Sequence, residues 1–223
     1  MKNIIITISR EYGSGGRDVG RILAGELGLP IFDKEIIHMA MEKSGMSEDF
    51  VAKHGESVPS KFRQNLQRLS LNVPNIRIPS GYNSAVAMSR TAGASNNNQS
   101  NADKLFFAQS SVIKEIAGMG GCVIVGRCAN YILKEHPNLL SVFIRGNLDD
   151  RMNRAVETYG MTEKDAAREV VKIDKHRANY YKFYTDKVWG AVDNYDLVIN
   201  TSYTDICGAV GVIKAMVGVK RKS

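Results

Sequence analysis

The chain has 223 residues, of which 43% are hydrophobic and 24% charged, and both fractions are ordinary for a globular protein. The length fits one α/β domain with a modest insertion, or at most two small domains, and no apolar stretch approaches the roughly 20 residues needed to cross a bilayer. The formal net charge of +7 favours an anionic partner, either a phosphorylated small molecule or nucleic acid. The three cysteines lack metal-ligand spacing, so we expect reduced thiols and no zinc site.

The opening third predicts a strand, a glycine-rich turn, a helix and a second strand. Residues 4–8 are continuously apolar and β-branched, which is typical of a strand buried on both faces of a parallel sheet. They lack the length and cleavage site of a signal peptide, so we expect a cytoplasmic protein. Apolar residues then recur at helical spacing up to a C-cap at Gly28, and residues 29–32 form a short strand that ends at Asp33. This order predicts a right-handed βαβ unit.

The next segment has a different composition. Residues 34–71 are polar with a helical pattern, whereas residues 72–101 are rich in Pro, Gly, Asn and Ser and are typical of a mobile loop. We therefore predict a single domain, residues 1–223, whose core consists of residues 1–40 and 105–223. Residues 41–104 are predicted to be a flexible insertion on the acceptor side of the site.

Short apolar strands alternate with helices through the rest of the chain. This alternation predicts a three-layer α/β fold with a five-stranded parallel sheet flanked by helices. The remaining strands are predicted at residues 122–125, 140–144 and 197–200, and the helices at residues 106–117, 129–134, 148–158, 163–183 and 204–217. The two charge-rich helices within residues 149–184 are interpreted as a helical lid.

The clearest candidate site lies between the first strand and the first helix. Its glycines allow backbone N–H groups to point into a concavity at a helix N-terminus, which suits a phosphate group. The residues are Gly13, Ser14, Gly15, Gly16, Arg17 and Asp18. A Walker A loop reads G-x-x-x-x-G-K-[ST]. Alignment on Gly16 puts Glu11 at the first glycine and Arg17 at the lysine, whereas alignment on the preceding strand puts Gly16 at the lysine, and both registers stay open.

Charged residues around this loop have candidate roles. Arg17 can neutralise phosphate oxygens with its planar guanidinium, unless it is an ordinary surface residue beside a tight turn. Asp18 can reach Mg²⁺ through water. Asp33 follows a parallel strand at the sheet edge where sites gather, so it can orient the acceptor or cap the next helix.

Three ordered motifs resemble the cytidylate kinase-like family, a divergent branch of the nucleoside monophosphate kinases with a P-loop fold. They are ITISREYGSGGRD at residues 6–18, VIVGR at residues 123–127 and DKHRANYY at residues 174–181. The likeness covers nearly the whole chain except about residues 60–104. It implies phosphoryl transfer from ATP, with Mg²⁺, to CMP or dCMP.

The resemblance also implies roles for matching residues. Arg127 matches an arginine that contacts the acceptor nucleotide. Asp174 and Arg177 match a D-x-x-R pair in the lid, where the arginine binds the transferring phosphate and the aspartate fixes its geometry or the acceptor. Three positions depart from the pattern: Cys128 replaces a cytosine-recognising aspartate, Met39 replaces an acceptor-binding arginine, and Val170 replaces a further arginine four residues before Asp174.

A second arginine pair supports the same chemistry. Arg151 and Arg154 lie three residues apart on one helix face, so Arg154 can close over the phosphates of ATP, unless both are solvated surface residues. Aromatic residues 180–189 can stack on a base or pack the helix on the sheet.

The sequence therefore predicts an ATP-dependent nucleoside monophosphate kinase with CMP or dCMP as the first candidate acceptor. The alternatives are a P-loop kinase for another small acceptor and a non-catalytic nucleotide-binding regulatory module. Nucleic-acid binding is supported by net charge alone. We expect small-molecule nucleotides as partners and no membrane association, and the oligomeric state stays open.

Overall fold

The computed structural model describes residues 3–45 and 101–220, and the predicted loop up to residue 100 lies outside these ranges. The strands are β1 (Ile5–Arg10), β2 (Ile31–Phe32), β3 (Cys122–Val125), β4 (Leu139–Arg145) and β5 (Leu197–Asn200). The helices are α1 (Gly16–Leu27), α2 (Glu35–Ser44), α6 (Asn101–Met119), α7 (Ala129–Ile132), α8 (Leu148–Tyr159), α9 (Glu163–Thr185), the short 3₁₀ helix η1 (Val192–Asn194) and α10 (Thr201–Lys220).

The five strands form one parallel sheet in the order β2-β3-β1-β4-β5, which confirms the predicted fold class. β1 is central, pairing with β3 on one side and β4 on the other. The two strands of the predicted βαβ unit, β1 and β2, are not neighbours in the sheet, because β3 lies between them.

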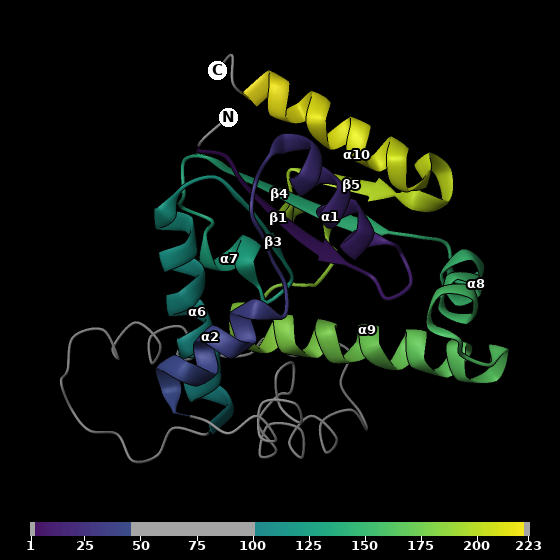
Figure 1. The fold of residues 1–223 in the computed structure, drawn as a ribbon. Coiled ribbons are helices and arrows are strands. Elements are labelled where there is room, and N and C mark those ends of the chain that lie inside the picture. The colour runs from purple at the N-terminus through teal and green to yellow at the C-terminus, as the bar shows by residue number, and fades with distance from the viewer. Residues whose placement is uncertain (1–2, 46–100, 221–223) are drawn as a thin grey trace.

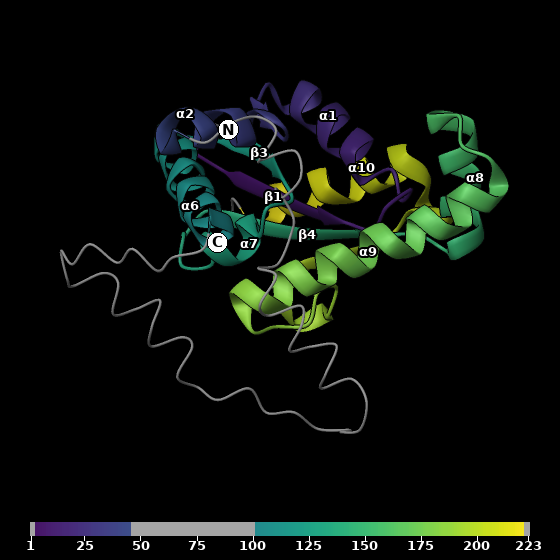
Figure 2. The same ribbon diagram turned by 90° about the horizontal axis from the view of Figure 1, so that it is seen from below.

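Helices cover both faces of the sheet in three layers (Figures 1 and 2). Successive residues of β1 point to opposite faces. Ile5 packs with α2, α6 and α7 in one apolar cluster, whereas Ile6 and Ile8 pack with α1 and α10 in another. All three isoleucines are completely buried, so the continuous apolar run of β1 is needed by both layers.

The predicted boundaries of the insertion overlap ordered helices. Residues 41–44 belong to α2 and residues 101–104 to α6, and these two helices pack together. Met41 of α2 packs against the buried cluster that contains Ile36 and Leu105, and Ala102 of α6 is buried, so apolar packing includes residues at both ends of the predicted insertion.

The last helix follows β5 directly and has a break near its start. Asp205 has φ 55° and ψ −172°, which is not helical, and its carboxylate accepts the N–H of Gly208 at 2.7 Å. The longer part of α10 is therefore capped by Asp205, close to its predicted start at Thr204.

One described helix is long and apolar enough to span a membrane by length and composition. This is Thr201–Val219 in α10, with a mean hydropathy of 1.2. Its inner face, with Ala209, Val210 and Ile213, is buried in the cluster that contains α1. A core helix of this kind meets the same criterion, so the finding is weak evidence for a membrane span.

Candidate functional site

The glycine loop connects the carboxyl end of β1 to α1. Gly15 is the N-cap of α1 with φ 76°, and Gly16 is the first helical residue. Ser14 is buried, its hydroxyl donates to the carbonyl of Glu11 at 2.8 Å, and the hydroxyl of Thr201 donates to the carbonyl of Ser14 at 2.8 Å. The Ser14 hydroxyl thus stabilises the turn of the loop, and Thr201, the residue after β5, connects the loop to the end of that strand.

Arg154 of α8 reaches the loop at Gly15. A Cβ atom at Gly15 would collide with Nη1 of Arg154, so only glycine permits this approach. Nη1 is buried and has no hydrogen-bond partner among the described residues. A buried donor on a cationic group that lacks a partner is unusual, and a phosphate oxygen would satisfy it.

Asp174 of α9 holds the loop from the lid side. Its Oδ1 accepts the backbone N–H of Tyr12 at 2.8 Å, and its Oδ2 is paired with Nη1 of Arg151. Arg151 is only 9% exposed, and it also donates to the carbonyl of Tyr12 at 3.3 Å and lies 3.5 Å from Oε2 of Glu11. Arg151 therefore connects the loop to α9, while Gly13 lies against the backbone of Arg151.

Arg177, one turn after Asp174, also contacts the loop. Its Nη1 donates to the carbonyl of Arg10 at 3.1 Å, and its guanidinium carbon lies 5.9 Å from the ring centre of Tyr12. Burial raises the pKa of Tyr12, and Arg177 opposes this rise. The predicted residues Asp174 and Arg177 are thus brought to the predicted loop.

Arg17 and Asp33 form an ion pair at the same edge, with 2.5 Å between Nε and Oδ2. The alternative that Asp33 caps the next helix is wrong, because the N-cap of α2 is Lys34 and makes no side-chain cap. The backbone N–H of Asp33 instead donates to Glu35 at 2.8 Å, and this bond lowers the pKa of the Glu35 carboxyl.

The predicted metal residue, Asp18, lies in the first turn of α1. Its carboxylate is 3.5 Å from the guanidinium of Arg21. In the described part of the chain, no group of three or more His, Cys, Asp or Glu residues is arranged to hold a metal ion.

A small pocket lies beside the loop, after the carboxyl end of β3. Its volume is about 20 Å³, and it is lined by Ser9, Arg10, Gly126, Arg127, Cys128, Arg177, Tyr180, Tyr181 and Trp189. The predicted acceptor residue Arg127 therefore shares a pocket with the predicted lid arginine. This volume is about that of one water molecule.

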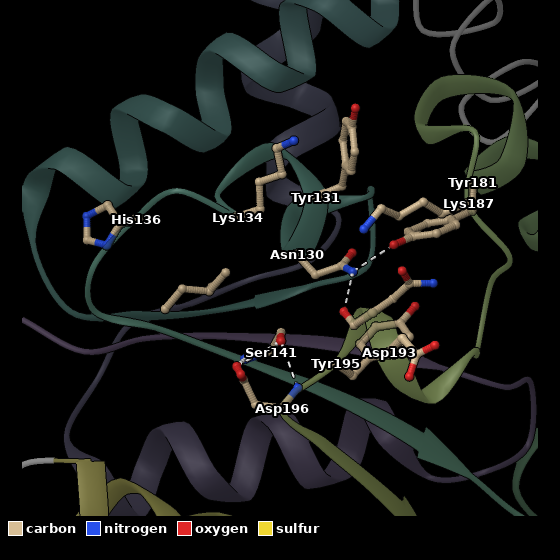
Figure 3. Close-up of a pocket in the computed structure, with 12 residues that line it drawn as sticks. Asn130, Tyr131, Lys134, His136, Ser141, Tyr181, Lys187, Asp193, Tyr195 and Asp196 are labelled. Carbon is tan, nitrogen blue, oxygen red and sulfur yellow. Dashed lines mark hydrogen bonds between the residues drawn. The ribbon is translucent and has the colours of Figure 1, made fainter. Parts of the chain in front are cut away.

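A larger cavity of about 320 Å³ lies elsewhere (Figure 3). It is lined by the beginning of β4, by α7 and by the segment before β5. The amide of Asn130 donates to the hydroxyl of Tyr181 at 2.9 Å, and Asp196 accepts from the backbone N–H and hydroxyl of Ser141 at 2.7 and 2.9 Å. None of the predicted site residues lines it, and sites in open α/β sheets lie at the opposite, carboxyl ends of the strands.

Sequence reasoning missed Arg10 and left Arg151 without an assigned role. Arg151 contacts the loop through long-range packing that no local pattern encodes, and the guanidinium of Arg10 lies against the distant Gly126. The available signal was a basic residue placed directly between a buried strand and a glycine-rich turn.

Comparison with known proteins gives the family of this chain. A family model described as the cytidylate kinase-like family matches residues 5–203. A cytidylate kinase from Pyrobaculum aerophilum is 21% identical over 210 residues, which cover 94% of this chain and 90% of the relative.

Solved structures with the same fold are an uncharacterised protein from Eubacterium ventriosum and two shikimate kinases. The first is 26% identical with a TM-score of 0.67, covering 97% of this chain and 99% of the other. The shikimate kinase from Bacteroides thetaiotaomicron is 11% identical with a TM-score of 0.52, covering 96% and 98%. The one from Acinetobacter baumannii is 12% identical with a TM-score of 0.50, covering 99% and 96%.

The parallel sheet, the glycine loop at its carboxyl edge and these neighbours define the fold of a P-loop kinase. Within this class, the chain belongs to the cytidylate kinase-like family.

Proposed function

We propose that this protein transfers a phosphoryl group from ATP to a nucleoside monophosphate, with CMP or dCMP as the first acceptors to test and the cytoplasm as its location. The observation that carries the proposal is the buried Nη1 of Arg154, which lies against Gly15 without a hydrogen-bond partner in the described residues. Family membership and the name of the archaeal relative support the same reaction.

The loop fits the phosphates of ATP. It combines a helix N-terminus, a left-handed glycine at the N-cap and an arginine nitrogen that lacks an acceptor. We propose that Gly13, Ser14, Gly15 and Gly16 hold the phosphates through backbone N–H groups and that Arg154 neutralises their charge. When bound, ATP supplies the transferred group: the bond between the γ-phosphorus and the bridging oxygen breaks, and a bond to an acceptor phosphate oxygen forms.

Mg²⁺ in such sites is bound through one or two carboxylates together with substrate phosphates. Asp18, in the first turn of α1, is the carboxylate that we propose for it, through water. Arg17 would bind phosphate oxygens with Asp33 as its ion-pair partner, and we propose that Asp33 faces the acceptor.

Arg127, Asp174 and Arg177 are proposed to bind the acceptor and the transferring phosphate. Arg127 and Arg177 line the pocket beside the loop, and Asp174 is one turn away on α9. We propose that α8 and α9 act as the lid, which opens to admit a nucleotide and then closes over it. Closure would exclude water, which limits hydrolysis of ATP.

ADP formation by the purified full-length protein tests the proposal. The protein is incubated with ATP, Mg²⁺ and one monophosphate at a time: CMP, dCMP, UMP, AMP, GMP or dTMP. The variants Arg154→Ala, Arg177→Ala and Arg17→Ala are then compared with a charge control, Lys214→Ala. Lys214 lies in an exposed ion pair with Glu26. Turnover that requires one monophosphate and falls at least about 100-fold in Arg154→Ala and Arg177→Ala would support the proposal. Binding of ATP without stimulation by any monophosphate would overturn it.

A kinase for another small acceptor is the second candidate. Cys128 is buried in the acceptor-side pocket, where the resemblance places a cytosine-recognising aspartate. If no monophosphate stimulates turnover, the same assay with shikimate and simple sugars separates this candidate from a regulatory module that only binds nucleotide.

A further inference from the structure

The loop lacks the lysine of a Walker A motif, and we align it with that motif on the start of α1, since a glycine-rich phosphate loop leads into a helix N-terminus. α1 begins at Gly16 directly after its N-cap Gly15. In G-x-x-x-x-G-K-[ST], these two residues then match the second glycine and the lysine. Counting back five residues places Arg10 at the first glycine. The loop thus has an arginine where the motif has glycine and a glycine where the motif has lysine.

The two exchanged positions are in direct contact. A Cβ atom added at Gly16 would lie 2.5 Å from Cβ and 3.2 Å from Cγ of Arg10. Real Cβ atoms do not approach this closely, and the obstructing atoms belong to the base of the Arg10 side chain, which cannot swing away. Arg10 and a side chain at residue 16 are therefore mutually exclusive with this backbone.

The guanidinium of Arg10 extends from the loop toward the acceptor side. A Cβ atom at Gly126 would collide with Nη1 of Arg10, so this glycine leaves room for the guanidinium. Arg10 and Gly126 line the same pocket as Arg127 and Arg177. The carbonyl of Arg10 accepts the bond from Arg177, which fixes the residue relative to α9.

We infer that Arg10 takes over the task of the missing lysine and contacts the transferring phosphate from the opposite end of the loop. This inference rests on the proposed function and deepens it. A lysine side chain in a Walker A loop reaches the β- and γ-phosphates. Arg10 begins beside the residue that replaces that lysine and ends between the glycine loop and the acceptor pocket, where donor and acceptor phosphates would meet. Its guanidinium can bind two oxygens at once.

A charge-exchange experiment tests this inference in the full-length protein. We expect Arg10→Ala to lower kcat for monophosphate-dependent ADP formation at least about 100-fold and Arg10→Lys to retain more activity than Arg10→Ala. Gly16→Lys alone is expected to be inactive, because the new side chain meets Arg10. The double variant Arg10→Gly/Gly16→Lys restores the Walker A order and is expected to exceed Arg10→Gly at least about tenfold in kcat.

Two measurements separate this role from a structural one. Thermal unfolding of every variant shows whether a loss of kcat follows a loss of fold, and rescue by Gly16→Lys cannot come from packing around Gly126. The inference would be overturned if kcat of Arg10→Ala stayed within about threefold of the parent protein. It would also be overturned if the double variant were no more active than Arg10→Gly.

Failure of the proposed function is recognised separately, because the parent protein would then show no monophosphate-dependent turnover. In that case ATP affinity by calorimetry is the deciding measurement. A decrease of at least about tenfold in Arg10→Ala with recovery in the double variant would still support a phosphate-binding Arg10. Unchanged affinity would overturn it.

Discussion

At the scale of single residues, the site depends on glycines that leave space for arginine side chains. Gly15 admits Arg154, and Gly16 and Gly126 admit Arg10. These contacts bring guanidinium groups to a loop that has no lysine of its own. The glycines of the loop are therefore needed both for the backbone turn and for the space that the neighbouring arginine side chains occupy.

Gly15→Ala tests this reading directly. The new methyl group would occupy the position of Nη1 of Arg154 on a backbone with φ 76°, so we expect ATP affinity to fall at least about tenfold. The matched control is Gly25→Ala in the same helix, where a Cβ atom meets nothing within 4 Å. That change is expected to raise stability by up to about 1 kcal/mol without altering ATP affinity. Unchanged affinity in Gly15→Ala would refute the proposed contact.

The cysteines provide a second prediction at this scale. Burial raises the pKa of Cys122 to about 11, whereas Cys207 is exposed. Since only the thiolate reacts, at pH 8 Cys122 would be about 0.1% ionised and almost inert. We expect a disulfide reagent to modify one thiol rapidly in the native protein, and Cys207→Ser to abolish this fast phase. A fast phase that persists in Cys207→Ser would show that a buried thiol is reachable.

At the scale of elements, local pattern was sufficient for most strands and helices. The apolar run of β1 and the helical periodicity of α1 are dictated by burial on both faces of the sheet. The pattern could not predict that β3 inserts between β1 and β2, because strand order depends on long-range pairing. It also placed the start of α6 at residue 106 instead of Asn101, because packing against α2 stabilises residues that are polar when read alone.

The contact between the glycine loop and α9 also belongs to this scale. Arg151 and Asp174 form an ion pair whose side chains are 11% and 17% exposed, and both also bond to the backbone of Tyr12. In a double-mutant cycle of Arg151→Met and Asp174→Asn, we expect a coupling free energy of about 1–3 kcal/mol. Urea unfolding measures it.

The reference for this cycle is the ion pair of Lys214 and Glu26, in which each side chain is 45% exposed. An exposed pair is expected to couple by less than about 1 kcal/mol. If the two cycles give equal values, Arg151 is not the link between the loop and α9 that the geometry indicates.

At the scale of the whole molecule, the sheet gathers residues from distant parts of the sequence at one edge. Arg17 pairs with Asp33, and Arg127 shares a pocket with Arg177; these residues were predicted individually and lie at one edge because parallel strands end on the same side. The predicted acceptor-side loop between residues 46 and 100 lies outside the described residues. The position of the Arg10 guanidinium could not be predicted, since Gly126 is brought to it only by the folded sheet.

Because the proposed ATP site joins β1, α8 and α9, ATP should stabilise the folded protein as a unit. A ligand at about 100 times its Kd adds about 2.7 kcal/mol to the free energy of unfolding. For a domain of this size, each kcal/mol raises Tm by roughly 2–4 °C, so we expect a rise of about 5–10 °C in a thermal unfolding experiment.

Arg154→Ala, at the same ATP concentration, should keep only about 1 °C of this rise if its Kd increases about 100-fold. Lys214→Ala removes the same charge from an exposed pair and should retain the full rise. An equal rise in Arg154→Ala would mean that ATP binds elsewhere, and the cavity of about 320 Å³ near β4 would then be the site to test.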